Sequence, residues 1–345
     1  MSELLKEFSR KATLAYARAR QPREYVGLTL FPMRATNELT FEYWRSQNLL
    51  PVMASVQAFG AEAQIASRDG AVKVSGEIPP IKRKINLGER ELIALKREGA
   101  GDVAMVRDQL YNDLDNMIDS VLARIEAMRM SALATGQIVL NENGLIMTVN
   151  YGVPAGNQTV LPAQNVAGGQ WNQANAEPIT MIQTWVDAVI AACGVRPTRA
   201  LTSNTVVANL IRNAQIRTMI YGDQGGSRAV SVNQLNDLMQ TLNLPQIATY
   251  DLQVRTQAED GTITAGRFFP ANRFVLLPAD ALGETLMGPT AEALLDVEVE
   301  AKEVAGVYAA VTQEAEPPAI WTKAAACAIP TFPQADAVFQ AQVLA

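Results

Sequence analysis

The stretch DVAMVRDQLYNDLDNMIDSVLARIEAMRMSALAT, residues 102–135, decides the fold of this 345-residue chain. Its apolar side chains recur every three or four residues, which is the spacing of a single stripe along an α-helix. They are Val103, Val106, Leu110, Leu114, Met117, Val121, Leu122, Ile125, Met128 and Leu133. Asp102 can cap the start of this helix and Gly136 can end it. A helix of this length would span about 51 Å, so the pattern predicts one helix of roughly three times the ordinary length.

Asp115 and Asp119 lie on one face of this predicted helix, because residues four apart are neighbours there. Two carboxylates at this spacing could act as a catalytic acid and base. No partner motif accompanies them in the sequence. A solvated or interface-facing acidic face therefore explains the pair better.

The residue types that carry most catalytic chemistry are scarce in this chain. It contains no histidine, which excludes Ser-His-Asp triads, imidazole acid/base catalysis and histidine zinc sites. Cys193 and Cys327 lie far apart among apolar residues, so they indicate buried, inert thiols and neither a disulfide framework nor a metal cluster. The sequence also lacks a secretion signal and an apolar run long enough to cross a membrane.

Segments before the long helix are poorly equipped to bury their own apolar side chains. Residues 2–21 predict a short basic helix, and residues 25–44 predict an extended arm whose aromatic side chains need cover from other structure. Residues 52–86 predict a hairpin turned at Arg68-Asp69-Gly70, because Asp-Gly tolerates the positive φ angles of a tight turn. The hairpin is thinly apolar, and a two-stranded ribbon is marginal alone in water. We expect it to be mobile or to lie against another surface.

Helices and strands are interleaved after residue 136, so this half of the chain is predicted to be of the α+β class. The predicted helices are 179–193, ended by Gly194, then 204–213, capped by Ser203, and 232–242. The predicted strands are 138–140 with 145–149 (turned at Asn143-Gly144), 199–202, 247–254 with 266–277 (linked by Asp260-Gly261), 296–302, 307–312, 320–328 and 337–344. Residues 150–178 predict a long loop. The glycine-rich segment 222–227 lacks the glycine spacing of phosphate-binding loops.

Charge is unevenly spread along the chain, whose formal net charge is -6. Residues 1–100 hold 16 Lys and Arg against 11 Asp and Glu, whereas residues 101–345 hold 13 against 24. Such opposite-signed parts favour self-association. The acidic excess between Asp280 and Glu316 would repel a phosphate backbone, although an acidic surface that only maintains solubility explains the same pattern.

The order of arm, hairpin, very long helix and interleaved α+β half resembles the tailed-phage major capsid proteins of the Hong Kong 97 fold, in particular the family of the lambda major capsid protein. Four stretches carry the resemblance. They are Phe31-Pro32 in the arm, the hairpin from Val52 through Arg68-Asp69-Gly70 to Lys82, the long acidic helix after Asp102, and the tail from Ala328-Ile329-Pro330 to Val343. The tail is the most specific of the four.

The resemblance implies a division of the chain into five parts. Residues 1–50 would be an N-terminal arm, 51–88 an extended loop that overlies a neighbouring subunit, 89–178 a peripheral domain with 102–135 as its spine helix, 179–278 an axial domain, and 279–345 the peripheral sheet and C-terminal strand. Gly222, Asp223, Gly225 and Gly226 would lie in an axial-domain loop near the five-fold and six-fold axes.

The implied function is that of a major capsid protein, which self-assembles into the icosahedral shell around the double-stranded DNA of a tailed phage. The implied partners are other copies of the chain, in pentamers and hexamers, together with scaffold, portal and decoration proteins. DNA would be enclosed without sequence-specific binding, and no membrane is implied. The protein would lie in the virion, after a stage in the host cytoplasm. The family is free of enzymes, so no catalytic residue, cofactor or metal is expected.

Contacts between subunits are expected from the arm, the hairpin and a charged pair of surfaces. The candidate residues are Phe31, Arg68, Asp69, Lys82, Arg83, Lys84, Glu298 and Glu300. We hypothesise that the basic cluster Lys82-Arg83-Lys84 contacts an acidic face of an adjacent subunit that carries Glu298 and Glu300. Exposed pairs of this kind would guide the register of the subunits more than they would stabilise it.

Two other function classes stay open from the sequence. An encapsulin-type nanocompartment shell shares the fold and would carry a cargo enzyme. A carboxylate-based enzyme or a cytoplasmic binding protein would use the α/β stretch 179–275 and would form a monomer or small oligomer. Large hollow particles distinguish the shell proteins from the last class.

Overall fold

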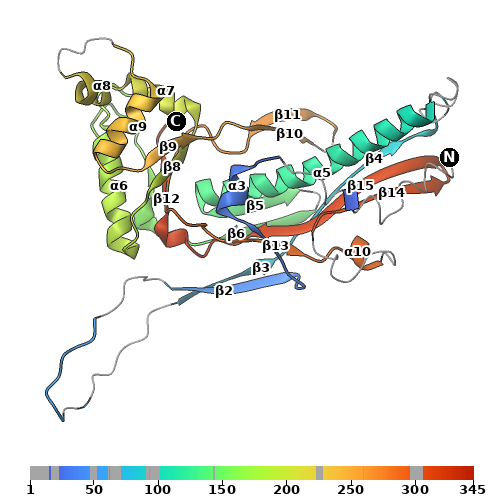
Figure 1. Cartoon of the computed structure of the whole chain (residues 1–345), viewed down its shortest axis with the longest axis horizontal. Coiled ribbons are helices and arrows are strands. Elements are labelled where there is room, and N and C mark those ends of the chain that lie inside the picture. The colour runs from blue at the N-terminus through green and yellow to red at the C-terminus, as the bar shows by residue number, and fades with distance from the viewer. Residues whose placement is uncertain are drawn as a thin grey trace. The chain divides into compact units, whose positions relative to one another are not determined.

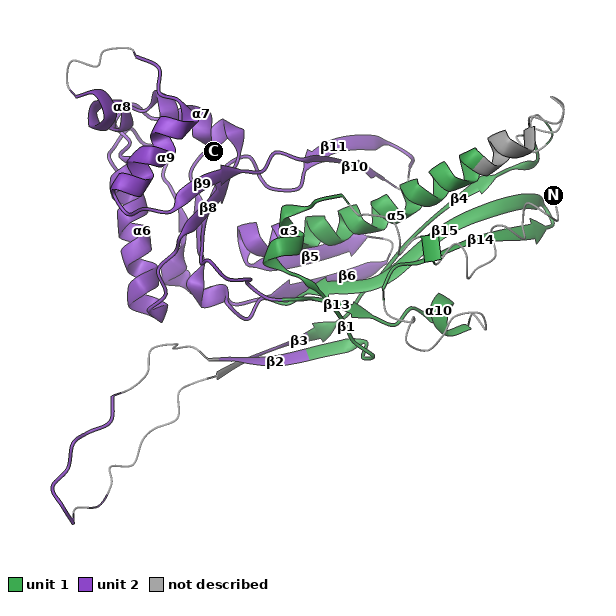
Figure 2. Ribbon diagram, in the orientation of Figure 1, with its two compact units in different colours: residues 1–41, 76–129, 284–331 green, residues 42–75, 130–283, 332–345 purple. Residues whose placement is uncertain are grey.

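The chain folds into two compact units, each built from separate stretches of sequence (Figure 2). Unit 1 comprises residues 1–41, 76–129 and 284–331, and unit 2 comprises residues 42–75, 130–283 and 332–345. The computed structural model describes residues 15–16, 23–46, 53–60, 62, 71–90, 93, 102–142, 144–222, 228–258, 260–295 and 306–345.

Unit 1 is organised around a sheet with the strand order β1-β13-β15-β14, in which β4 also pairs with β15 (Figure 1). Its elements are α3 (Val26–Leu30), β1 (Met33–Ala35), β4 (Pro80–Leu87), most of α5 (Asp102–Thr135), β13 (Thr285–Gly288), α10 (Ala291–Leu295), β14 (Tyr308–Ala315) and β15 (Pro318–Pro330). All contacts of β15 within this sheet are antiparallel, and β1 pairs parallel to β13.

The 13-residue strand β15 holds the sheet of unit 1 together. It pairs with β4 along one edge, and with β14 and then β13 along the other. Small side chains fill its buried second half, from Ala324 to Ala328. On one face, Leu110 of α5 packs with Ile320 and Val311, and on the other Ala293 of α10 packs with Tyr308 and Ala310. Because both faces are covered, the strand shows an almost continuous apolar sequence.

Unit 2 contains a mixed five-stranded sheet with the order β7-β16-β12-β8-β9. The elements of the unit are β5 (Gln137–Glu142), β6 (Leu145–Asn150), β7 (Gln158–Val160), α6 (Pro178–Cys193), β8 (Arg199–Thr202), α7 (Asn204–Arg212), α8 (Ala214–Tyr221), α9 (Val232–Thr241), β9 (Gln246–Thr249), β10 (Gln253–Gln257), β11 (Ile263–Arg267), β12 (Arg273–Leu277) and β16 (Phe339–Gln342), with short 3-10 turns at Ala155–Asn157 and Ala335–Ala337. Its core centres on stacked aromatic rings: Trp185 lies 5.1 Å from Phe339 and 5.7 Å from Trp171 between ring centroids.

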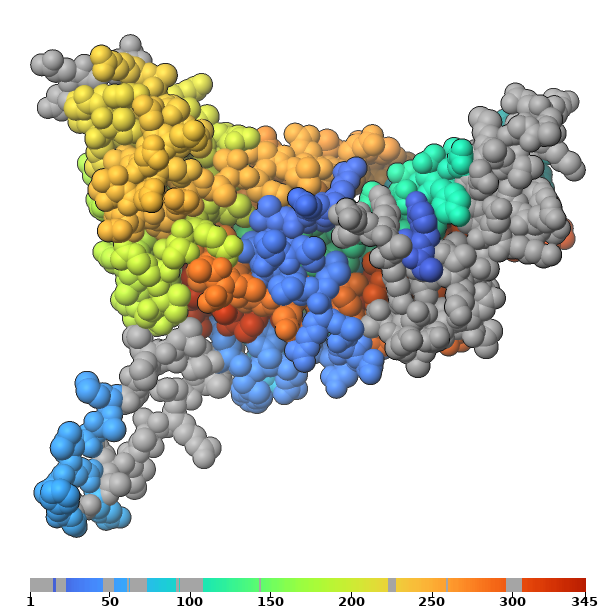
Figure 3. Space-filling model, viewed as in Figure 1, coloured from blue at the N-terminus to red at the C-terminus, as the bar shows by residue number. Residues whose placement is uncertain are grey.

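Two further strands form the base of an extended hairpin. β2 (Thr40–Ser46) and β3 (Ala71–Glu77) pair with each other in a two-stranded sheet. The segment 53–60 lies in the connection between them, blue at the lower left of Figures 1 and 3, well apart from the helices and sheets of unit 2. The predicted turn at Arg68-Asp69-Gly70 lies outside the described residues.

The most local sequence patterns are confirmed. Helix α5 spans the predicted 102–135, and α6 ends at Gly194, whose φ is +72°. Ser203 caps α7, because its hydroxyl accepts a hydrogen bond from the Val206 amide at 3.2 Å. The hairpin predicted after α5 is β5–β6.

Several predicted elements differ in the structure. The arm is not extended throughout, because α3 forms a helical turn that buries Gly27 and Leu30. Helix α8 was not predicted; the side chain of Asn213 caps it by accepting a hydrogen bond from the Gln215 amide. The strands predicted at 247–254 and 266–277 are each two strands, because the chain leaves the main sheet to form the β10–β11 ribbon.

The ends of the predicted sheet also change. Strand β16 pairs with β12 and β7 in unit 2 and not with the sheet of β15. β14 and β15 extend a few residues beyond the predicted 307–312 and 320–328. The strand predicted at 296–302 and most of the helix predicted at 2–21 lie outside the described residues.

The end of α5 gives a test of the fold. Gly136 has φ +69°, and a Cβ there would lie 2.7 Å from Val153 Cγ2, whereas Gly144 has φ +79° with open space around it. We expect Gly136→Ala to lower the free energy of unfolding by about 2–4 kcal/mol and Gly144→Ala by about 1 kcal/mol, because only the first adds a steric clash to backbone strain. Chemical denaturation of both variants measures this, and equal losses would contradict the packing at the helix end.

Candidate functional site

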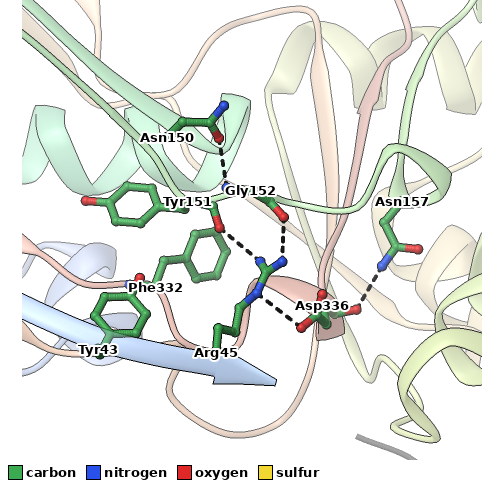
Figure 4. A network of polar contacts seen from close by, with 8 residues as sticks. All are labelled: Tyr43, Arg45, Asn150, Tyr151, Gly152, Asn157, Phe332 and Asp336. Carbon is green, nitrogen blue, oxygen red and sulfur yellow. Dashed lines mark hydrogen bonds and ion pairs between the residues drawn. The ribbon is translucent and has the colours of Figure 1, made fainter. Parts of the chain in front are cut away.

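The root of the extended hairpin contains a buried arginine that is held by a network of polar contacts (Figure 4). The Arg45 side chain on β2 is 6% exposed. Its Nη1 donates to the carbonyl oxygen of Tyr151 at 2.9 Å, and its Nη2 donates to that of Gly152 at 2.7 Å. Its Nε lies 3.5 Å from Oδ2 of Asp336. One guanidinium thereby joins β2 to two other segments of the unit.

Further hydrogen bonds fix the residues around Arg45. The carbonyl oxygen of Asp336 accepts a hydrogen bond from the Asn157 side chain at 2.8 Å. The Tyr43 hydroxyl accepts one from the Phe332 amide at 3.1 Å. Because side chains alternate along a strand, Tyr43 and Arg45 point to the same side of β2, and Trp44 points to the other, where it is 65% exposed.

Burial governs the titration of this site. Desolvation raises the pKa of Asp336, although the neighbouring charge of Arg45 acts to lower it. Desolvation likewise raises the pKa of the Tyr151 hydroxyl well above its ordinary value. The guanidinium is thus bound mainly by dipoles of backbone carbonyls, with a carboxylate at the edge of the group.

The tip of the same hairpin is bare. Met53, Val56 and Phe59 are 92%, 101% and 110% exposed, and they are spaced three residues apart. Large apolar side chains this exposed are a feature of surfaces that meet a partner. The hairpin therefore combines a root that is tied down by buried polar contacts with a tip that its own chain leaves uncovered.

A second polar cluster, in unit 1, contains part of the predicted basic surface. Lys84 of β4 stands directly opposite Lys323 of β15 in the strand register, a like-charge arrangement that is unfavourable by itself. Glu292 of α10 compensates, because its Oε1 lies 2.8 Å from Lys82 Nζ and 2.7 Å from Lys323 Nζ. Lys84 also lies over the ring of Trp321, 4.4 Å from its centroid.

These contacts set the charge of Glu292. Burial alone would raise the pKa of the carboxyl group, but hydrogen bonds from Lys323 and Lys82 outweigh it and lower the pKa to about 2. The carboxylate therefore stays ionised at neutral and mildly acidic pH. It contributes most to stability above the ordinary pKa of a glutamate.

The other predicted contact residues are distributed differently. Phe31 is fully buried inside unit 1, so its own chain covers its side chain, and its carbonyl oxygen accepts a hydrogen bond from Thr285; its contact with a neighbouring subunit stays a prediction. Gly222 ends α8 with φ +74°. The remaining predicted residues Arg68, Asp69, Asp223, Gly225, Gly226, Glu298 and Glu300 lie outside the described residues.

Arg45, Asp336 and Glu292 were not predicted as site residues. One signal was present for Arg45, which follows the aromatic pair Tyr43-Trp44 in a strand that alternates in burial. No local signal pointed to Asp336 or Glu292.

The described part of the chain offers little for other chemistry. It holds no cluster of three or more Cys, Asp or Glu side chains that could bind a metal ion. None of its helices combines the length and the hydropathy that crossing a membrane requires.

Comparison with known proteins identifies the relatives of this fold. The model of the family described as phage major capsid protein E matches residues 12–343. No curated protein sequence matches the chain at a significant level.

Solved structures agree over nearly the whole length. A protein assigned as the capsid protein of a prophage in Escherichia coli CFT073 superposes with a TM-score of 0.58 at 12% identity, covering 99% of this chain and 96% of that one. A phage-related protein from Bordetella bronchiseptica RB50 gives 0.56 at 12% identity, with coverage of 96% and 95%. The capsid of cyanophage A-1(L) gives 0.51 at 14% identity, with 92% of both chains covered. The chain has the Hong Kong 97-type fold.

Removal of the buried guanidinium tests the root. We expect Arg45→Met to lower the free energy of unfolding by about 3 kcal/mol, since it leaves two carbonyls and a carboxylate buried without their donor. Arg255→Met, at an exposed position, should change it by less than about 0.5 kcal/mol. In the double variant Arg45→Met/Asp336→Leu the loss should be smaller than the sum of the single losses, because both charges are gone. Strict additivity in denaturant melts would refute the coupling.

Acid titration tests the second cluster. We expect Glu292→Gln to destabilise unit 1 by roughly 1–3 kcal/mol at pH 7. This difference from the wild type should persist down to about pH 4.5 and shrink towards zero near pH 2, because protonation then removes the wild-type charge as well. Glu89→Gln, at an exposed site, is the control. A difference that does not change with pH would rule out the ion pairs as its source.

Proposed function

Because this chain belongs to the family of the phage major capsid protein E, we propose that its copies assemble as pentamers and hexamers into the icosahedral head shell of a tailed phage. The role of the family is structural and not enzymatic, and the encapsulin alternative is not favoured. The shell would enclose double-stranded DNA without sequence-specific contacts. The protein belongs in the virion, and we propose that it passes through the host cytoplasm before assembly.

The observation that carries this proposal is the contrast between the two ends of the hairpin. Arg45 at the root is bound to Tyr151 and Gly152, whereas Phe59 at the tip is fully exposed. A monomeric protein gains nothing from holding apolar side chains away from its own core. A shell subunit does, because the neighbouring copy supplies the missing cover. Contacts that pass from each copy to the next in a closed ring then build the shell.

On this basis we assign the parts of the chain to the domains of a shell subunit. Unit 1, with the spine helix α5, would supply the peripheral domain, and residues 179–278 of unit 2 would supply the axial domain. The loop that begins at Gly222 would lie near the symmetry axes. Scaffold, portal and decoration proteins are further proposed partners.

Contacts within the chain limit how the basic cluster Lys82-Arg83-Lys84 can bind an acidic face of a neighbour. Lys82 is bound to Glu292 of its own chain, and Lys84 lies over Trp321. An acidic neighbour that carries Glu298 and Glu300 would have to share Lys82 with Glu292 and Lys84 with Trp321. We therefore propose a shared network and not a separate interface.

Electron microscopy of the purified protein tests the function. The wild type should form hollow closed particles. The variant Met53→Ser/Val56→Ser/Phe59→Ser should reduce the yield of closed particles by at least about tenfold while the subunit stays folded, because its apolar cover for the neighbour is lost. Ser55→Ala/Ala58→Ser alters the same segment, leaves the three apolar side chains in place, and should assemble normally. A wild type that stays monomeric at assembly concentrations would overturn the proposal.

A further inference from the structure

The β10–β11 ribbon of unit 2 is exposed on both faces. The two strands pair over their full length, from Gln253 with Arg267 to Gln257 with Ile263. Every residue of β11 is exposed, and so is every residue of β10 except the half-buried Val254. No third described strand joins this sheet. A two-stranded ribbon without cover is marginally stable in water, so contact with another surface would stabilise it.

The root of the ribbon is held in a fixed direction. Asp251 joins it to the N-terminus of α7, because its Oδ2 accepts a hydrogen bond from the Asn204 amide at 2.7 Å and its Oδ1 binds Arg267 of β11. The rings of Tyr250 and Phe268 stack beside it with centroids 6.5 Å apart. The Phe268 amide also donates to the Leu252 carbonyl at 3.2 Å. These contacts anchor both strands where they leave the core of the unit.

The outer edge of strand β9, in the same unit, is covered by a side chain, whereas the described strands leave the edges of the ribbon unpaired. β9 is the edge strand of the main sheet, and its outer side is covered by one amide side chain. The Oδ1 of Asn236 accepts a hydrogen bond from the Ile247 amide at 2.9 Å, and its Nδ2 donates to the Ile247 carbonyl at 3.2 Å. Proteins cover edges in this way to prevent unwanted strand addition. Among the described strands of the same unit, none pairs with either outer edge of the ribbon.

The side chains of the ribbon favour a weak and repeated contact. Thr256 and Thr264 form a hydroxyl pair 2.9 Å apart, Arg255 is exposed, and Ile263 is the one large apolar side chain exposed on these two strands, at 59%. Tight binding of a foreign protein depends on a cluster of aromatic or aliphatic anchors, which this surface lacks. A contact made through backbone edges and hydroxyl groups suits a partner that is present many times at high local concentration.

We propose that the β10–β11 ribbon is an intersubunit arm, which adds its open strand edge to a second copy of this chain in the assembled particle. The proposal rests on the proposed shell function, since only a shell supplies that second copy at a fixed position. Backbone pairing provides the contact, and Arg255 provides a positive group for an acidic surface of the neighbour. The fixed root ensures that every subunit presents the arm in the same direction.

Thiol protection tests the arm. Both native cysteines, Cys193 and Cys327, are buried, so an introduced thiol becomes the reactive one. The variant Ile263→Cys places it on the ribbon, and Gln246→Cys places it on the covered strand β9 as the matched control. In assembled particles we expect maleimide to react with the thiol of the Ile263→Cys protein at least about tenfold more slowly than in dissociated subunits. The control should differ by less than about twofold.

The outcomes separate the arm from the shell function. If closed particles form and the Ile263→Cys thiol reacts equally fast in particles and in dissociated subunits, the proposed arm is wrong and the proposed shell function still holds. Equal slowing at both positions would indicate general shielding and would also contradict the arm. A protein that forms no particles would overturn the shell function and the arm with it.

A second measurement avoids any effect of the substitution on folding. In wild-type protein, hydrogen exchange of peptides that cover 253–257 and 263–267 should slow by at least about tenfold on assembly, because new edge pairing protects backbone amides. Unchanged exchange rates in closed particles would be evidence against the arm.

Discussion

The extended hairpin depends on the burial of one guanidinium at its root. A charged group removed from water is costly, and Arg45 offsets this cost with two hydrogen bonds to the carbonyls of Tyr151 and Gly152 and an ion-pair contact with the carboxylate of Asp336. The same contacts fix the strand from which the hairpin leaves unit 2. Its apolar tip, with Phe59 fully exposed, is then held away from the core that could otherwise cover it. In the proposed shell, a neighbouring copy buries these apolar side chains.

Elements that follow local patterns were predictable from the sequence, and elements that depend on distant partners were not. The apolar stripe of α5 and the Ser203 cap of α7 each depend on residues that are close together in the sequence, so both elements were predictable. The turn α3 exists because Gly27 donates to Glu126 of the distant helix α5, and no pattern in the arm records that contact. The pairing of Arg45 with Asp336 joins opposite ends of the chain, which explains why the root was missed.

The uneven charge of the sequence, which favours self-association, has a second consequence in the fold. Some basic residues of the first part bind acidic residues of the last part inside one chain. Arg34 lies 2.9 Å from Glu284, and Lys82 lies 2.8 Å from Glu292, both within unit 1. Part of the charge division is therefore matched by ion pairs within one subunit. The argument for a shell rests instead on the family, the fold and the exposed apolar tip.

Hydrogen exchange along the hairpin tests the central claim most directly, because it compares the root and the tip of one element in the same sample. In dissociated subunits, amides of 42–46 should be protected and those of 53–60 should exchange at rates close to those of an unfolded chain. In closed particles, protection should extend to 53–60. Protection of 53–60 already in the dissociated subunit, or its absence in closed particles, would contradict the account that a fixed root presents a bare tip to a neighbour.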